Sequence, residues 1–362
     1  MKHFLFIVLL SMSFYCLGKE QYFDKWIVVT SIQKPTQQTR KKIDRYRTLA
    51  QLFGWHLLVI GDKKTPEWQL DNANYLSTSD QANLPYKLAR LLPWNHYARK
   101  NMGYLYAIEH GAQIIYDTDD DNEPYGALDP LNDQEHLKEI ISSHSSINIY
   151  NYFERPTVWP RGLPLPDISI GNDFTLSSPK AVKIGIEQGV VDREPDVDAI
   201  FRLTRNQEVY FAEQPACVLP IGTYCPFNSQ NTFIHKDAFF TLYIPTTVSM
   251  RVADIWRGYF AQKLIGLLGM QVAFSGPNAI QDRNEHNLLR DFKDELDLYL
   301  KSGSLVAFLS QWQAASSQPE AMMLALYQDL ASAGFIAQQE IELCTAWLAD
   351  FKYVLEKNKQ LQ

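Results

Sequence analysis

The stretch IIYDTDDDN, at positions 114–122, places four carboxylates within five positions: Asp117, Asp119, Asp120 and Asp121. The apolar and aromatic residues directly before them predict a buried strand. Like charges at this spacing repel one another, and partial burial strengthens the repulsion. The run is therefore either an exposed acidic turn or a place where a cation binds.

Two further apolar runs, KWIVVT at 25–30 and WHLLVI at 55–60, also predict strands. An amphipathic helix is expected at 37–53, and a second helix between Pro93 and a stop at Gly111. This alternation is typical of an α/β fold with a Rossmann-type, mostly parallel sheet flanked by helices. Ligands of such sheets bind outside the carboxyl ends of the strands. We therefore expect Thr30, Ser31, Asp62 and the aspartate run on one rim.

The rest of the chain divides into a loop-rich middle and a helical end. Short strands are predicted at 147–153, 198–204 and 230–235, followed by a helix that starts after Asp254 and a strand at 271–277. From about residue 287 the pattern is helical. We predict a signal segment at 1–18, a catalytic domain at 19–286 and a C-terminal helical appendage at 287–362.

The N-terminus has the pattern of a secretory signal. Lys2 and His3 precede an apolar run at 4–17, which is shorter than the roughly 20 residues of a membrane span. Cleavage is expected near Gly18, so the chain would be secreted or extracytoplasmic, in a secretory-pathway lumen or a periplasm. A short membrane anchor is the alternative, and membrane contact is expected only if this segment stays uncleaved.

Charge and cysteine usage bound the function further. The formal net charge is −7 and the pI about 5.7, so the composition argues against nucleic-acid binding. An oxidising compartment permits a Cys217–Cys225 disulfide and leaves Cys344 free. The absence of CxxC and Cys/His spacings predicts no zinc site.

The aspartate run has the chemistry of a divalent-cation site. Asp119 and Asp121 alternate, so in an extended segment they point to the same side and Asp120 points to the other. Carboxylate oxygens suit Mg²⁺ or Mn²⁺, and such a cation can stabilise a departing diphosphate. His286 is a candidate third ligand, although a lone histidine is more often a surface or capping residue.

Three other groups are candidates for substrate contacts. Arg99 and Lys100 could donate to phosphate oxygens, with a solvated basic helix face as the alternative. Asn228 and Asn231 lie in an amide-rich and aromatic segment that suits a hydroxyl-rich ligand such as a sugar, with a polar strand edge as the alternative.

Asp254 has two interpretations. It stands where the N-cap of the following helix is expected, and it could also act as a general base for an incoming hydroxyl. Because Asn caps a helix about as well as Asp, Asp254→Asn is expected to keep the melting temperature and to lose activity only if Asp254 is the base.

Taken together, these segments resemble a known family. KWIVVTSIQKPT, VIGDKKTPEW, HYARKNMGYLYAIEHGAQIIYDTDDDN, WPRGLPL, PDVDAIFRLTR, GTYCPFNSQNTFIH and VADIWRGYFAQKL are similar, in this order, to the STELLO glycosyltransferase family over about residues 25–300. A more distant similarity runs to the reversibly glycosylated polypeptides, the UDP-arabinopyranose mutases. These share a DDD after a strand and a D-x-W-x-G helix, here Asp254 to Gly258.

The resemblance implies a GT-A fold and a nucleotide-sugar donor, in particular a UDP-sugar. It also implies Mn²⁺ or Mg²⁺ on Asp119 and Asp121, and a glycan or protein acceptor. It assigns the donor-binding residues as Thr30, Ser31, Asp62, Arg99 or Lys100, Asn228, Asn231 and Trp256, and the catalytic base as Asp254. A metal-dependent glycosyltransferase is the first hypothesis. The alternatives are a nucleotide-sugar mutase or self-glycosylating protein, and a non-catalytic scaffold on a glycosyltransferase fold.

Overall fold

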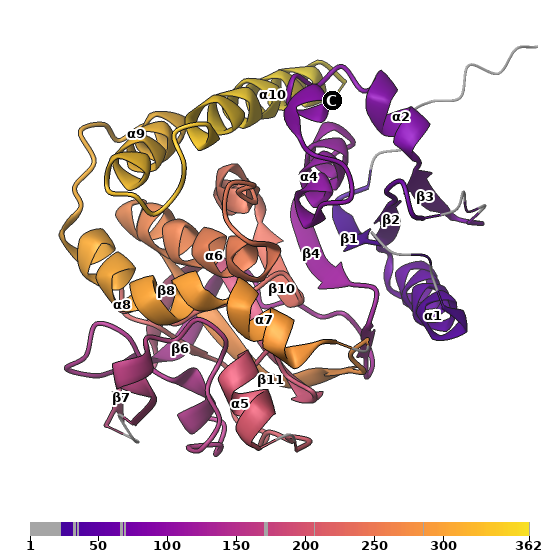
Figure 1. The fold of residues 1–362 in the computed structure, drawn as a ribbon. Helices are drawn as coiled ribbons and strands as arrows, with labels where there is room; N and C mark the ends of the chain where they lie inside the picture. Colours follow the sequence, from indigo (N-terminus) through magenta and orange to yellow (C-terminus); the bar gives the residue numbers. More distant parts are fainter. Residues whose placement is uncertain are drawn as a thin grey trace, which may run out of the picture.

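The computed structural model describes residues 23–361 except 32–33, 35, 66–67, 69, 170–172, 206 and 285. The predicted signal segment at 1–18 therefore lies outside the described residues. The described strands form one extended sheet in the order β3-β2-β1-β4-β10-β8-β11-β9-β6-β7, with β5 paired to β11 (Figure 1). Their bounds are β1 (Lys25–Thr30), β2 (His56–Ile60), β3 (Ala73–Leu76), β4 (Ile114–Asp119), β5 (Asn122–Pro124), β6 (Gln134–Ile141), β7 (Thr175–Leu176), β8 (Lys180–Arg193), β9 (Cys217–Val218), β10 (Asn231–His235) and β11 (Met270–Gln281).

The first half of the chain follows the predicted pattern. β1 lies between β2 and β4, and both pairings are parallel. α1 (Gln37–Phe53) has the predicted bounds, because Thr36 accepts the amide of Thr39 at its start and Gly54 takes a left-handed φ of 71° at its end. Between β3 and β4 come the short helices α2 (Thr78–Asn83) and α3 (Leu88–Leu91), the 3-10 turn η1 (Tyr97–Arg99) and α4 (Lys100–Glu109). The carboxyl ends of β1, β2 and β4 therefore meet at one edge.

The prediction of a mostly parallel sheet is wrong, because the sheet is mixed. β10 runs antiparallel to both of its neighbours, β4 and β8, while β8 and β11 are parallel to each other. A strand that pairs in parallel needs a crossover connection of a dozen or more residues. The side chains of a strand alternate with the same period whichever way the strand runs in the sheet. The direction of β10 was therefore not readable from its sequence.

The middle of the chain contains two further corrections. Residues 147–153 hold the 3-10 turn η2 (Ile149–Asn151) rather than a strand. Residues 198–204 form helix α5 (Ala199–Thr204), whose first turn is capped by the Asp198 carboxylate accepting the amide of Phe201. The longest strand of the described sheet, β8, was not predicted, since its charged and glycine residues interrupt the apolar pattern.

Helix α6 (Met250–Leu267) starts earlier than predicted. Ser249 is its N-cap and accepts the amide of Arg251, so Asp254 lies inside the helix and does not cap it. α6 lies under the C-terminal helices and packs against β11. The capping interpretation of Asp254 is therefore wrong, and its side chain has another role.

The C-terminal helices form an arc along one side of the molecule, drawn in orange to yellow (Figure 1). They are α7 (Leu288–Asp294), α8 (Leu296–Gln311), α9 (Pro319–Ser332) and α10 (Glu340–Leu361). Two buried acids attach α10 to the rest of the fold. Glu340 accepts the amides of Thr246 and Thr247, and Asp350 accepts the amides at the start of α3. The helices share one apolar core with the central sheet.

Two further observations concern the cysteines and membrane spans. Cys217, Cys225 and Cys344 are all buried free thiols, so the disulfide that an oxidising compartment would permit between the first two is not formed. Within the part of the chain that the structure describes, no helix combines the length and apolar character needed to cross a bilayer.

Candidate active site

The acidic turn lies at the carboxyl end of β4, between β4 and β5. Asp119 and Asp121 both line one cavity of about 150 Å³. Asp120 turns the other way and accepts a hydrogen bond of 2.8 Å from the Ser31 hydroxyl. The alternation in the sequence thus predicted correctly which carboxylates share a side.

The cavity is formed by residues from distant parts of the chain. Besides the two aspartates it is lined by basic, acidic and amide side chains from the segments around β8, β10, α6 and β11: Arg161, Asp196, Asn228, Gln230, Arg251, Asp254, Gln281, Arg283 and His286. Its volume is smaller than the roughly 300–1,000 Å³ of pockets that enclose whole small-molecule ligands. It therefore has room for the charged centre of a substrate, such as a cation with phosphate groups, and not for a complete nucleotide sugar.

The residue that starts the acidic run, Asp117, is fully buried and neutralised from both sides. Lys100 Nζ lies 2.6 Å from Asp117 Oδ1, and the Arg257 guanidinium lies 3.2 Å from Oδ2. Lys100 also contacts Asp119 Oδ1 at 3.1 Å and the carbonyl oxygens of Thr118 and Ser229. The Lys100 ammonium is thus surrounded by protein oxygens, which favours a role in positioning the strand end over the predicted contact with a diphosphate.

The carboxylates of the turn are destabilised as anions. Burial, partly offset by Lys100, raises the pKa of Asp119 to about 6. Burial and the neighbouring Asp121 raise the pKa of Asp120 to about 7, and burial also raises the pKa of Asp121. The cause is desolvation together with like charges at close range. A cation placed against these oxygens would relieve both.

The turn nevertheless has a defined position. Gln281 donates to Asp121 Oδ2 at 2.9 Å, and Asn122 donates to Oδ1 at 3.1 Å. The buried Lys42 of α1 donates to the carbonyl oxygen of Asp121 and forms an ion pair with Asp282. The end of β11 and helix α1 therefore hold the turn in its orientation.

The donor set fits a divalent cation that shares its coordination with substrate. In the described parts of the chain no three His, Cys, Asp or Glu side chains are grouped closely enough to hold a metal ion. His286 lines the cavity but pairs with Asp291 at 3.1 Å, so it does not complete such a group. Mg²⁺ in nucleotide sites is commonly held by one or two carboxylates and completed by phosphate oxygens and water. Asp119 and Asp121 match this pattern.

Asp254 faces the cavity as the partner of a buried arginine. The Arg161 guanidinium donates to both oxygens of Asp254, at 3.2 and 3.0 Å, and also to Asp196 at 2.8 Å. Burial opposes ionisation of Asp196, but the Arg161 charge outweighs it and holds the Asp196 pKa below its usual range. The three side chains form one buried cluster in which Arg161 connects two carboxylates.

Arg283 is the least compensated cation of the cavity. Its side chain is 8% exposed, and its nearest ion-pair partner is Asp196 at 3.9 Å, which is already bound to Arg161. Burial and the nearby charges of Arg251 and Arg202 lower the Arg283 pKa to about 9. Burying a cation without a close carboxylate is costly, and a bound anion would compensate the charge.

The rim residues predicted from the first two strands lie where expected, and the side chains of Ser31 and Asp62 are engaged with the protein. Thr30 Oγ1 is enclosed without a hydrogen-bond partner among the described residues, and Ser31 binds Asp120. The Asp62 carboxylate accepts the backbone amides of Asn95 and His96 at 2.9 and 3.1 Å, so it orders the loop before α4.

Other predicted residues separate into those at the cavity and those in the core. Asn228 lines the cavity and donates to Asp196 at 2.8 Å. Asn231 points away and accepts from the Tyr116 hydroxyl. Arg99 is fully buried, stacks on Trp94 and donates to the carbonyl oxygen of Ala89, so it does not reach the rim.

Trp256 is likewise placed away from the cavity. Its side chain is fully buried in α6 and packs against the rings of Phe260 and Phe335. It contributes to the contact between α6 and the C-terminal helices instead of contacting a donor.

Sequence reasoning missed Arg161, Asp196 and Arg283. Arg161 and Asp196 stand in the segments WPRGLPL and PDVD, where isolated charges among prolines and apolar residues were the only signal. Arg283 stands three positions before His286, in QDRNEH, within a loop that has no periodicity. Their convergence depends on long-range contacts.

The chain is similar to proteins of a known family. A family model described as STELLO glycosyltransferases matches residues 251–361. The chain is also 35% identical over 349 residues to the probable glycosyltransferase STELLO1 of Arabidopsis thaliana, an alignment that covers 90% of the chain and 44% of that protein. The probable glycosyltransferase STELLO2 of the same plant is 35% identical over 353 residues, which cover 91% of the chain and 45% of the relative. The chain belongs to the STELLO glycosyltransferase family.

The family match can be placed on the fold. The matched region runs from α6 to α10 and includes Asp254, Arg283 and His286, whereas the acidic turn lies before it. The alignments with the plant STELLO proteins extend over nearly the whole chain, although the chain spans less than half of the length of these relatives.

Proposed function

We propose that this STELLO family member is a metal-dependent glycosyltransferase with a GT-A-like arrangement, which moves a sugar from a nucleotide-diphosphate sugar, in particular a UDP-sugar, to a glycan or protein acceptor. One observation carries the proposal. Two carboxylates with raised pKa values, Asp119 and Asp121, and one undercompensated buried cation, Arg283, line the same cavity at the carboxyl edge of the sheet.

The charge of the cavity suits such a donor. Its lining includes four aspartates and three arginines, which leaves one net negative charge. A divalent cation changes this to one net positive charge, and a diphosphate brings negative charge that offsets it. Without the cation, the same diphosphate would meet a negative cavity and bind poorly.

In this proposal Mn²⁺ or Mg²⁺ supplies Lewis-acid stabilisation of the leaving diphosphate. Asp119 and Asp121 would hold the ion, and Arg283 would donate to phosphate oxygens as a charge-assisted donor. Lys100 and Lys42 keep the acidic turn in position through the contacts described above.

The remaining groups would act on the acceptor and the sugar. An acceptor oxygen forms a bond to the anomeric carbon, the bond from that carbon to the diphosphate oxygen breaks, and the acceptor proton passes to a base. Asp254 is the proposed base, because each of its oxygens retains a lone pair beside its hydrogen bond to Arg161. Asn228 and Gln230 line the same cavity and offer amide groups to sugar hydroxyls.

Titration calorimetry with Mn²⁺ and UDP tests the metal and the diphosphate together. The parent should bind UDP only when Mn²⁺ is present, and Asp121→Ala should abolish this binding. Asp120→Asn is the matched control, since Asp120 belongs to the same turn but binds Ser31 instead of facing the cavity. Equal affinity of parent and Asp121→Ala would rule out the proposed site.

A thermal-shift screen of nucleotide sugars with Mn²⁺ would then identify the donor. Transfer to an added glycan or protein is the expected activity. Isomerisation of a free nucleotide sugar without any acceptor would instead show the mutase activity of the more distant relatives.

We also propose an extracytoplasmic location, on the basis of the apolar segment at 4–17. Mass spectrometry of the protein expressed in its host should give a mature start near Lys19. An intact Met1 in the membrane fraction would show that the segment serves as an anchor.

A further inference from the structure

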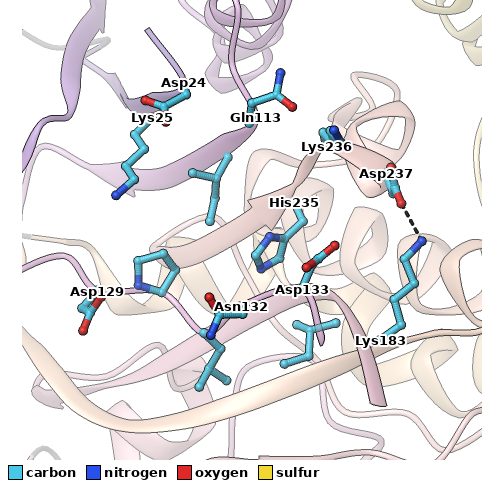
Figure 2. A pocket seen from close by; sticks show the side chains of 14 residues that line it. Asp24, Lys25, Gln113, Asp129, Asn132, Asp133, Lys183, His235, Lys236 and Asp237 are labelled. Atoms are coloured by element: carbon cyan, nitrogen blue, oxygen red, sulfur yellow. Dashed lines mark hydrogen bonds and ion pairs between the residues drawn. The ribbon is translucent and has the colours of Figure 1, made fainter. Parts of the chain in front are cut away.

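Figure 2 shows a second pocket, of about 380 Å³. It lies at the opposite edge of the sheet from the acidic turn. It forms where β1 and β4 begin and where the antiparallel β10 ends, and it is closed on one side by the loop at 129–133. Its location on β4 is five residues from Asp119, which corresponds to about 17 Å along a strand. A single sugar ring bound here would not reach the active-site cavity.

The centre of this pocket contains a polar atom that lacks a partner. His235 Nε2 is enclosed and has no hydrogen-bond partner among the described residues. Burial lowers the His235 pKa, so the imidazole is neutral at pH 7. A neutral imidazole has one N–H donor and one acceptor nitrogen, so Nε2 can pair with a donor or an acceptor, and a hydroxyl group can serve as either.

Charged side chains of both signs surround His235 (Figure 2). Lys183 and Asp237 form an ion pair of 2.5 Å at one side. Within the described residues the other five charged side chains of the lining have no ion-pair partner: Asp24, Lys25, Asp129, Asp133 and Lys236. Four carboxylates and three ammonium groups nearly cancel, so the pocket offers alternating acceptors and donors and little net charge.

The floor of the pocket is apolar. Ile114 and Ile184 are buried beneath it, and Pro130 and Leu131 form a wall. Such a floor suits the C–H face of a ligand whose rim carries hydroxyl groups. Among the described residues of the lining, no three His, Cys, Asp or Glu side chains are grouped closely enough to hold a metal ion.

We propose that this pocket is a second glycan-binding site, which holds a neutral, hydroxyl-rich sugar unit of an extended acceptor away from the active-site cavity. Sugar hydroxyls donate and accept at adjacent atoms, which matches the mixed carboxylate and ammonium rim and the unpartnered Nε2 of His235. A ligand with strong net charge of either sign would meet unpaired like charges in the same pocket. That this sugar belongs to an acceptor rests on the proposed function. That the pocket binds a sugar does not depend on it.

Saturation-transfer difference NMR on the full chain tests the proposal, with neutral tetrasaccharides of glucose, mannose, galactose and xylose as probes. At least one should bind. Asp133→Ala and His235→Phe should each weaken that binding by about tenfold, the loss expected when one or two hydrogen bonds are removed. Asp133 is exposed, so its variant is expected to fold normally. Asp173→Ala, at an exposed aspartate outside the pocket, is the matched control and should bind like the parent.

The controls also separate this inference from the proposed function. Asp121→Ala should retain tetrasaccharide binding and lose UDP–Mn²⁺ binding. Loss of tetrasaccharide binding in Asp121→Ala would assign the sugar to the active-site cavity and overturn the second site. Failure of every tetrasaccharide to bind, or binding unaffected by both pocket variants, would overturn it as well. UDP–Mn²⁺ binding absent in the parent, with tetrasaccharide binding at the pocket intact, would refute only the proposed function.

Discussion

The variant Asp254→Asn tests the role of the buried Arg161 cluster. The sequence alone predicted no change in melting temperature, because it interpreted Asp254 as a helix cap. In the structure Ser249 is the cap, and Asp254 accepts two hydrogen bonds from Arg161. An asparagine can accept only one of them, and its amide group then faces the second guanidinium N–H, donor against donor.

The magnitude follows from burial. The side chains of Asp254 and Arg161 are 8% and 5% exposed. Removing one partner of a buried ion pair typically costs about 3–5 kcal/mol. Asp196 remains 2.8 Å from Arg161, which keeps the guanidinium partly compensated and places the loss near about 2–3 kcal/mol. For a chain of this size the melting temperature should fall by about 3–4 °C.

Differential scanning fluorimetry measures the loss of stability, and transfer assays with the donor found by the nucleotide-sugar screen measure the loss of activity. If Asp254 takes the acceptor proton, turnover should fall by about 10²–10⁴-fold while donor affinity stays unchanged. Asp196→Asn is the matched control, because it breaks the other carboxylate contact of the same arginine and should lose similar stability. Parent-like turnover in Asp254→Asn would refute its role as base. Equal turnover losses in both variants would show that Asp254 acts only through Arg161.

Three further predictions follow from buried charges. Arg283→Met should weaken UDP–Mn²⁺ binding by about tenfold or more, because a charge-assisted hydrogen bond is lost. Arg290→Met, at a side chain that is 78% exposed, should leave the affinity measured by calorimetry unchanged. Similar affinities in both variants would exclude Arg283 from the site. Burial raises the pKa of Glu187 to about 7 from an unfolded value near 4.5. The protonated side chain therefore stabilises the fold below about pH 4.5, and this stabilisation is lost as the pH rises towards 7. Glu187→Gln should match the melting temperature of the parent at pH 4 and melt about 5 °C higher at pH 8, and an equal difference at both pH values would contradict this assignment. Glu340→Ala leaves the partly buried amides of the 246–247 segment without their acceptor and should cost about 3 kcal/mol in urea unfolding. The exposed Glu342→Ala should cost less than about 0.5 kcal/mol. A small loss at Glu340 would show that it does not anchor α10.

Local sequence patterns determined the parts of this fold that depend on neighbouring residues. The bounds of α1 follow from the cap at Thr36 and the left-handed Gly54. The sequence also separated Asp119 and Asp121 correctly from Asp120, although β4 ends at Asp119 and the next two residues lie in a turn.

The choice between adjacent basic residues was decided by tertiary packing. Arg99 and Lys100 are neighbours, and nothing local indicates which one faces the aspartates. In the structure Arg99 is held by the α2–α3 segment through Gln81 and Ala89, and Lys100 enters the space beside Asp117. Contacts between elements therefore decided the outcome.

The direction of β10 and the composition of the cavity also came only from the tertiary structure. A strand has the same apolar period in either orientation, so β10 could be placed as a strand but not as antiparallel. Arg161 and Asp254 are 93 positions apart in the sequence and yet share two hydrogen bonds. Periodicity and capping act over one or two turns of chain, whereas the partner of a buried charge depends on how the intervening loops bring distant segments together. That is why the sequence identified the carboxylates at the edge of the sheet, and only the folded chain supplied the arginines that face them.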